Sequence, residues 1–209
     1  MTTATPESPL RPLRLVIWGL LLGLVLLVAG MAAWHALAPR TSDLPVLRLG
    51  GDFTLAGSDG RSFHLADQHG RLVLLSFGFT SCPDICPLTL ARYRAVLAEL
   101  GPDAARLQPV MISVDPVRDT MAKLAAYVRY FDSRILGLTG TRAQLALIER
   151  QYGAIVNVPE AGEAGEVSHS GYLYLIDDLG RVRRLYDQQA SVRDIVREAR
   201  DLLREAGGR

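Results

Sequence analysis

The sequence predicts an α/β domain with a parallel central sheet, preceded by a single apolar helix that crosses a membrane. Three observations lead to this fold class. The 20 residues from Leu15 to Trp34 carry no charge. Two largely apolar runs, residues 71–79 and 107–114, are typical of strands buried on both faces of a sheet. Segments with helical spacing separate them, and strands that alternate with helices indicate parallel strands joined by crossover helices.

The apolar segment has the length and the flanking residues of a membrane anchor. A helix of 20 residues is about 30 Å long, which matches the hydrocarbon core of a bilayer. Trp18 and Trp34 lie near its two ends, where interfacial aromatic side chains are expected. Arg11 and Arg14 precede it, so the positive-inside tendency places the N-terminus in the cytoplasm and the rest of the chain across the membrane.

A cleaved signal peptide is the alternative to an anchor, because Ala36-Leu37-Ala38 has the small-x-small pattern of a cleavage site. The apolar run is longer than the usual signal-peptide core of about 7–15 residues, and Pro39 would directly follow the cut. The anchor is therefore the favoured interpretation. It divides the chain into a cytoplasmic tail at residues 1–14, a transmembrane anchor at 15–37, a linker at 38–46 and a globular domain at 47–209.

The composition is that of ordinary globular material. Hydrophobic residues make up 49% of the chain and charged residues 22%. The residues after the linker are enough for one domain with a full core. The formal net charge of +1 gives no electrostatic argument for a nucleic-acid partner.

The first half of the domain is predicted to contain a hairpin, a buried strand and a helix. Residues 52–67 fit two short strands around the turn Ser58-Asp59-Gly60. Residues 71–79 form the first buried strand. Apolar residues then recur at helical spacing from Leu90 to Leu100, and Gly101-Pro102 ends this helix.

The second half of the domain repeats the alternation. Residues 107–114 form the second buried strand, and helices are expected at 120–131 and 142–152. A strand–turn–strand unit occupies 171–187, and a helix at 192–206 closes the domain. This order fits a thioredoxin-type sheet, which by itself carries no function.

The stretch FTSCPDICP, residues 79–87, contains both cysteines of the chain. A residue before proline is disfavoured in the α region, so we expect Cys82 and Cys86 to be extended or turn-like, with Cys86 capping a helix that begins at Pro87. The motif then lies at the C-terminal end of a buried strand, where ligands and reactive groups gather in open α/β sheets. The nearby helix N-terminus is expected to lower the pKa of the thiols.

Three kinds of site fit this cysteine pair. A structural disulfide is permitted in an oxidising compartment, but a loop this short stabilises by only about 2 kcal/mol. A thiol–disulfide oxidoreductase would cycle the pair between dithiol and disulfide. A metal site would need at least one further ligand.

The chain has four histidines, and one is well placed for that ligand. His35 ends the apolar segment, and His64 and His69 flank the predicted hairpin. His169 lies in a loop directly before an apolar strand that neighbours the cysteine strand in a thioredoxin-type sheet, and its placement fits a ligand and a surface histidine equally. Two thiolates and one imidazole suit Cu(I), whereas a closed structural zinc site usually needs four ligands.

These residues resemble the Sco/SenC family of copper-binding proteins, which help to assemble cytochrome c oxidase. The resemblance runs from the anchor to the last helix. Its most specific parts are four stretches in the same order: FGFTSCPDICP at 77–87, ISVDPVRDT at 112–120, LGLTGT at 136–141 and SHSGYLYLID at 168–177.

The resemblance implies a thioredoxin-like fold, and it implies that Cys82, Cys86 and His169 carry copper, as Cu(I) or Cu(II). The implied partners are subunit II of cytochrome c oxidase, with its binuclear copper centre, and other copper chaperones. The resemblance implies a domain that faces the periplasm or the intermembrane space. Together with the apolar segment and the arginines before it, this predicts a location in the bacterial inner membrane, with one span, a cytoplasmic N-terminus and a periplasmic domain. The expected function is that of a membrane-anchored copper chaperone. The alternative is a thiol–disulfide oxidoreductase that reduces the cysteines of that subunit or acts in redox signalling.

Two departures bear on this choice. Many relatives carry an acidic residue before the histidine, where this chain has Ser168, so a carboxylate that orients the imidazole is in doubt. Thioredoxin-type reductases keep two residues between their cysteines and place a proline before the facing strand. This chain has three residues between its cysteines, and Ser170-Gly171 stands where the proline would be. Both differences disfavour the oxidoreductase.

Three aspartates in or after the cysteine motif also have candidate roles in the sequence analysis. Asp119 is expected to cap the helix that follows it, and Asp115 is left open between that role and a partner-facing loop. Asp84, between the cysteines, either takes part in hydrogen bonding beside the site or stabilises the turn.

Overall fold

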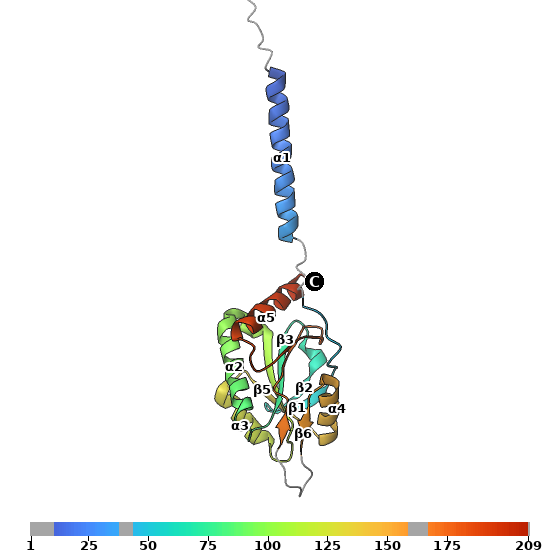
Figure 1. The fold of residues 1–209 in the computed structure, drawn as a ribbon, viewed down its shortest axis with the longest axis vertical. Helices are drawn as coiled ribbons and strands as arrows, with labels where there is room; N and C mark the ends of the chain where they lie inside the picture. Colours follow the sequence, from blue (N-terminus) through green and yellow to red (C-terminus); the bar gives the residue numbers. More distant parts are fainter. Residues whose placement is uncertain (1–10, 38–43, 159–166, 209) are drawn as a thin grey trace, which may run out of the picture. The chain divides into compact units, whose positions relative to one another are not determined.

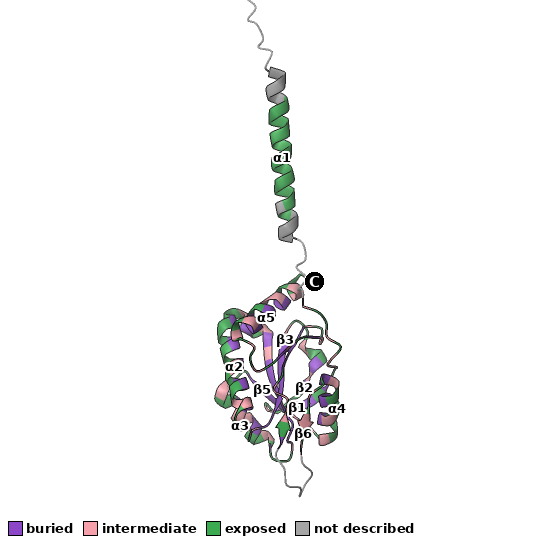
Figure 2. Ribbon diagram, in the orientation of Figure 1, coloured by how far each residue is buried: buried purple, intermediate pink, exposed green. Residues whose placement is uncertain are grey.

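The computed structural model describes residues 11–37, 44–158 and 167–208. The chain divides into two compact units, Met1–Arg40 and Thr41–Arg209. The first unit contains α1, Arg11–Leu37, a single helix (Figure 1) whose large apolar side chains from Val16 to Met31 are exposed (Figure 2). Among the described residues, no helix meets the combined length and apolarity of a membrane-spanning segment. The anchor at residues 15–37 stays a prediction.

The second unit is built on a seven-stranded sheet with the order β2-β1-β5-β4-β3-β8-β9. Its central strands β5, β4 and β3 are parallel, and the strands on either side of them are antiparallel to their neighbours. A separate two-stranded sheet pairs β6 with β7. The strands are β1 Thr54–Gly57, β2 Ser62–His64, β3 Leu72–Gly78, β4 Leu107–Ser113, β5 Leu136–Thr139, β6 Val156–Asn157, β7 Ser168–His169, β8 Leu173–Ile176 and β9 Val182–Tyr186.

Helices cover both faces of the large sheet (Figure 1). Alternate residues of β3 point to opposite faces, so Leu72 and Leu74 pack in one core and Val73 and Leu75 in the other. The first core includes α2, α3 and α5, and the second includes α4 and the β1–β2 hairpin. The helices are α2 Ile85–Leu100, α3 Met121–Phe131, α4 Arg142–Tyr152 and α5 Val192–Gly207, with short 3-10 turns at Leu65–Gln68 and Gly101–Arg106.

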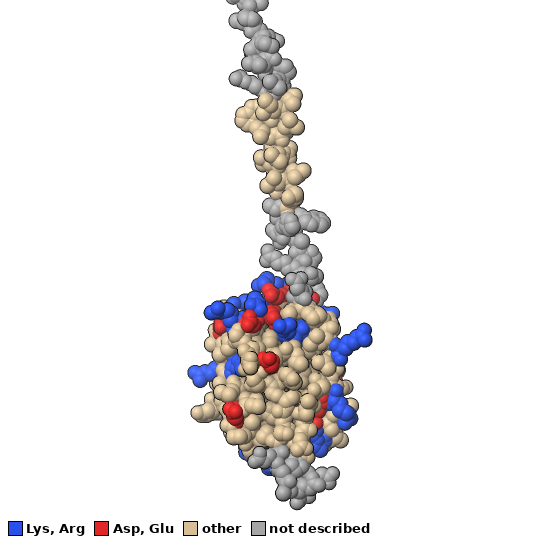
Figure 3. Space-filling model, viewed as in Figure 1, with Lys and Arg blue, Asp and Glu red and all other residues tan. Residues whose placement is uncertain are grey.

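The described segment that precedes β1 is bonded to β9, the last strand in the order of the sheet. Arg183 of β9 is buried and donates to the Leu44 carbonyl, with its Nε 3.1 Å from that oxygen. The same guanidinium pairs with Asp177 and with Glu205 of α5. Acidic and basic side chains are mixed over α5 on the face shown in Figure 3. Leu44 falls within the linker predicted at 38–46, and the predicted boundaries themselves stay predictions.

The mixed α/β fold predicted from the sequence is confirmed, and most of its elements lie where the patterns place them. The hairpin, both buried strands and the last helix agree within a few residues. Gly101 ends α2 with φ 61°, a conformation that glycine adopts without strain. The short strand β5 and the β6–β7 pair have no counterpart in the sequence prediction.

The start of α2 is a correction to the sequence prediction. The helix begins at Ile85, so Cys86 lies in its first turn instead of capping it, and its backbone is helical rather than extended. Asp84 occupies the N-cap position without a capping bond from its side chain. Pro87 is accommodated because the first backbone N–H groups of a helix have no acceptor within the helix, so the missing donor costs nothing there.

Candidate metal centre

The three predicted ligands come together at one edge of the sheet. The two cysteine Sγ atoms and one ring nitrogen of His169 all lie within 4.8 Å of one another, and Cys86 Sγ is 3.1 Å from His169 Nε2. Both cysteines are free thiols. The strand topology explains the arrangement: Cys82 follows β3, and His169 precedes β8, which pairs with β3 in the antiparallel direction. Residues after one strand and before its antiparallel neighbour share an edge.

The two thiols differ in their access to solvent. Cys86 is 3% exposed and packs in the interior, whereas Cys82 and His169 are partly exposed. Gly78 lies against the buried thiol: a Cβ atom added there would be 2.9 Å from Cys86 Sγ and 2.9 Å from Met111 Cε. Gly78 therefore provides the room in which this sulfur sits.

The imidazole of His169 is oriented by the backbone. Its Nδ1 lies 3.0 Å from the Ser170 carbonyl oxygen, so Nδ1–H donates to that oxygen and Nε2 carries the lone pair toward Cys86. The edge of the ring meets Phe79, with centroids 5.8 Å apart at 87°. Ser168 is exposed. The Ser170 carbonyl oxygen therefore orients the imidazole, as a carboxylate does for many metal-bound histidines.

Burial shifts the protonation equilibria of Cys86 and His169 toward the neutral form. Burial lowers the pKa of His169, although the bond to Ser170 opposes this, and the ring is neutral at physiological pH. Burial also raises the pKa of the Cys86 thiol, and the neighbouring Cys82 and Asp119 add to the increase. The lowered thiol pKa expected from the helix N-terminus is therefore wrong for Cys86, because desolvation outweighs the helix dipole in the metal-free protein.

Asp119 is a second correction, and it is a residue whose role the sequence analysis missed. Thr120, not Asp119, caps α3 by accepting from the Lys123 backbone N–H. The Asp119 carboxylate is buried and turns toward the cysteine loop, where it accepts from Thr80 and from Ser113 Oγ at 2.7 Å. The position of the DPVRDT stretch could have indicated this, because it follows the strand parallel to β3 and carboxyl ends of parallel strands meet.

The remaining candidate residues lie outside the cluster. Asp115 is buried and bonded to the Arg118 guanidinium at 2.5 Å, which gives it a structural contact. Asp84 is exposed. His64 bonds to Asp52 at 2.8 Å, and His69 is exposed. The fourth histidine, His35, lies where side chains are outside the described part of the structure.

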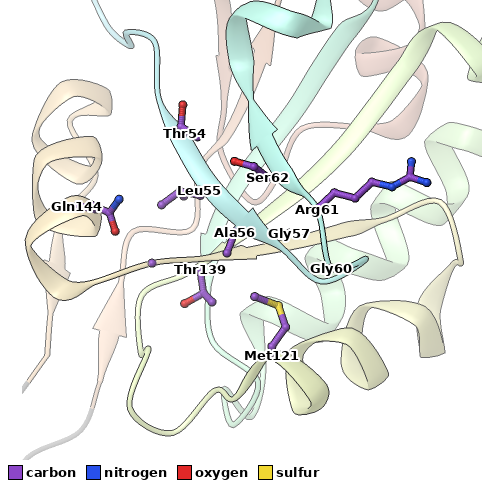
Figure 4. A pocket seen from close by; sticks show the side chains of 11 residues that line it. Thr54, Leu55, Ala56, Gly57, Gly60, Arg61, Ser62, Met121, Thr139 and Gln144 are labelled. Atoms are coloured by element: carbon purple, nitrogen blue, oxygen red, sulfur yellow. The ribbon is translucent and has the colours of Figure 1, made fainter.

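A cavity of about 420 Å³ lies apart from the cluster, where the β1–β2 hairpin meets β5 (Figure 4). Met121 at the start of α3 and Gln144 of α4 contribute to its wall. None of the three candidate ligands lines it. The cysteine–histidine cluster is therefore separate from this cavity.

The fold and the site define a class of protein: a mixed α/β domain with a Cys–Cys–His cluster at one edge of its sheet. A family model described as SCO1/SenC matches residues 42–204, and the chain belongs to this family. The family resemblance seen in the sequence is thereby confirmed.

Known relatives support the assignment over most of the domain. The mouse protein SCO2 homolog, mitochondrial, is 39% identical over 166 residues, which are 77% of this chain and 65% of the mouse protein. This chain therefore spans just under two thirds of the length of that relative. A SCO2-like protein of Rickettsia felis is 32% identical over 184 residues, covering 82% of this chain and 90% of that protein.

Solved structures show the same fold. Bradyrhizobium japonicum ScoI with copper bound is 30% identical, with a TM-score of 0.67 over 74% of this chain and 99% of that chain. Yeast Sco1 with copper bound is 33% identical, with a TM-score of 0.65 over 74% of this chain and 90% of that chain. BsSco, described as a member of the Sco family of cytochrome c oxidase assembly proteins, is 23% identical with a TM-score of 0.63 and supports the fold alone.

Proposed function

We propose that this protein is a copper chaperone that binds Cu(I) through Cys82, Cys86 and His169. One observation carries the proposal: two free thiols and an imidazole nitrogen lie within 4.8 Å of one another, with Cys82 and His169 partly exposed. Thiolate and imidazole are ligands that Cu(I) accepts in low coordination number. Among the described residues this cluster has three members, whereas a closed structural zinc site usually takes four ligands. The related proteins solved with copper bound support the choice of metal.

The function that follows is delivery of copper to cytochrome c oxidase during its assembly, with the binuclear centre of subunit II as the client. Membership of the family supports this role. Other copper chaperones would supply the metal, and Cu(II) is a second oxidation state for the same ligands. In a strain that lacks this protein, we expect assembled oxidase to fall and added copper to restore part of it. Intact oxidase at both low and high copper would contradict the role.

A second function is supported by the free thiols themselves. Cys82 is partly exposed, so it can attack a disulfide in a client protein. In that exchange Cys82 and Cys86 lose two protons and two electrons to become a disulfide, and the client's disulfide gains them as two thiols. Reduction of the cysteines of subunit II is the corresponding task, with redox signalling as a wider one. Histidine is not needed for it, which separates the two functions experimentally.

We also propose that α1 anchors the domain to the bacterial inner membrane, with the N-terminus in the cytoplasm and the domain in the periplasm. The 20 uncharged residues from Leu15 to Trp34 and the arginines before them support this topology. Extraction of isolated membranes with alkaline carbonate tests it. The protein should stay in the membrane fraction, and its release into the wash would contradict the anchor.

His169→Ala is expected to weaken Cu(I) binding by at least about tenfold, because the imidazole supplies one of three ligands and loss of even an outer partner of a metal ligand typically costs 10–100-fold. The full chain, reduced and without oxygen, is titrated with Cu(I) against a competing chelator. His69→Ala is the matched control, because His69 is exposed and outside the cluster, and it should bind like the wild type. Tight binding that is indifferent to His169 would make the thiol exchange function the better one.

The apparent Cu(I) affinity is expected to rise with pH. Because burial raises the pKa of the Cys86 thiol, the metal-free site still holds this proton at neutral pH, and Cu(I) must displace it. The affinity then rises by about tenfold per pH unit for each proton released. The lowered pKa of His169 keeps the imidazole neutral, so its protonation opposes binding only in acid. Competition titrations across neutral pH, with proton release measured in two buffers, check this, and a flat profile would contradict it.

A further inference from the structure

We propose that Asp119 and Lys123 are positioning residues that together hold the segment Thr80–Ser81 and thereby fix Cys82 opposite Cys86 and His169 before the metal binds. We call this pair and its bonds to Thr80 and Ser81 the latch. The inference rests on the proposed function, because it assigns how the Cu(I) site is made ready.

The latch is a set of short polar contacts around one buried carboxylate. Asp119 Oδ2 accepts from the Thr80 backbone N–H at 2.9 Å, and Asp119 Oδ1 accepts from Thr80 Oγ1 at 2.5 Å. Ser113 Oγ donates to Oδ2 at 2.7 Å, which ties the carboxylate to the end of β4. Lys123 Nζ lies 3.7 Å from Oδ1 and donates to Ser81 Oγ at 3.2 Å. Three of these contacts reach the two residues that precede Cys82, and the other two hold the Asp119 carboxylate in place.

The latch acts on the ligand that lies in a turn, outside any helix or strand. Cys86 is fixed by α2 and by its packing against Gly78 and Met111. His169 is fixed by β7 and by the Ser170 carbonyl. Cys82 lies in the turn between β3 and α2, where its backbone N–H donates to the Phe79 carbonyl at 3.3 Å. Holding Thr80 and Ser81 sets where this turn places its sulfur.

The charges of the latch also suit a metal–thiolate site. Cu(I) bound to two thiolates and a neutral imidazole carries a net charge of −1, so an unpaired buried carboxylate beside it would oppose binding. The Asp119 side chain is fully buried, and the Lys123 ammonium beside it supplies the opposite charge. The Asp119–Lys123 pair therefore holds the cysteine loop and carries no net charge of its own. A serine or threonine in place of Asp119 would make fewer of these bonds.

Thr80→Val and Thr80→Ser separate the latch from general stability. Valine has the shape of threonine but no hydroxyl to donate to Asp119, whereas serine keeps it. We expect Thr80→Val to lower the Cu(I) affinity about tenfold and Asp119→Asn to lower it by about 10–100-fold, the range for outer partners of metal ligands. Thr80→Ser keeps the hydroxyl and should bind Cu(I) with an affinity within about twofold of that of the wild type. Thermal unfolding of each full-length variant identifies any variant that fails to fold. If Asp119→Asn fails to fold, Thr80→Val still tests the latch.

The second readout needs no metal. The rate at which an alkylating reagent modifies Cys82 in the metal-free, reduced protein should rise severalfold in Thr80→Val and return to the wild-type rate in Thr80→Ser. Unchanged alkylation together with unchanged Cu(I) affinity in Thr80→Val and Asp119→Asn would overturn the latch. If the wild type itself fails to bind Cu(I), the proposed function fails. The alkylation rates then still decide whether Asp119 positions Cys82.

Discussion

Replacing Cys86 with serine is expected to lower the Cu(I) affinity by more than about a hundredfold, the largest effect on function that we predict. Cys86 is the most buried of the three ligands, and its loss removes a soft thiolate that serine cannot replace. Loss of an outer partner of a metal ligand already costs up to about 100-fold, and loss of the ligand itself costs more. The measurement is the chelator competition described for His169→Ala.

Two further variants make this prediction specific. Cys86→Ala removes the sulfur without placing a hydroxyl in an apolar site, so it should show the same loss of copper with a smaller loss of stability. Cys82→Ser removes the exposed thiol and should also abolish tight binding. An affinity within tenfold of the wild type in both Cys86 variants would exclude the three-ligand site, because two remaining ligands would then suffice.

Gly78→Ala is expected to damage both folding and copper binding. The added Cβ would lie 2.9 Å from Cys86 Sγ and 2.9 Å from Met111 Cε, closer than such atoms pack, so the sulfur or its neighbour must move. Overpacking of this kind lowers the free energy of unfolding by about 1–3 kcal/mol. Displacement of Cys86 Sγ should in addition lower the Cu(I) affinity by about tenfold or more. Chemical denaturation and the competition titration measure the two effects.

Gly137→Ala is the matched control for this prediction. Gly137 lies in β5, where an added Cβ would lie 2.6 Å from Leu124 Cγ, so the variant is overpacked without contact to a ligand. It should lose a similar amount of stability and keep its Cu(I) affinity. If Gly78→Ala loses stability but binds Cu(I) like Gly137→Ala, then Gly78 is needed only for packing.

The sequence predicted the helices and strands whose apolar pattern extends over many residues. The apolar runs that became β3 and β4, and the spacing of apolar residues in α2, each extend over seven residues or more. β5 has four residues with a glycine among them, and β6 and β7 have two each, so none carries a recognisable period. These short pieces are fixed by pairing with strands distant in the sequence.

The three candidate ligands could be named from the sequence because the chain has two cysteines and four histidines and because the family resemblance selects His169 among them. The contacts around these ligands could not be predicted from the sequence. Asp119 follows a capping pattern locally, yet its carboxylate bonds to Thr80, 39 positions away. The direction of the Cys86 pKa likewise depends on how deeply the packed sheet and helices bury the sulfur, which no local pattern reports.

The unequal exposure of the two thiols sets an order of events for any metal that leaves the cluster. If the cluster holds a metal ion, an incoming ligand from a partner would meet it on the side of Cys82 and His169, which are partly exposed. The bond to Cys86, which is 3% exposed, is then the last to break. The depth at which one sulfur lies therefore sets the order in which the three ligands would be exchanged.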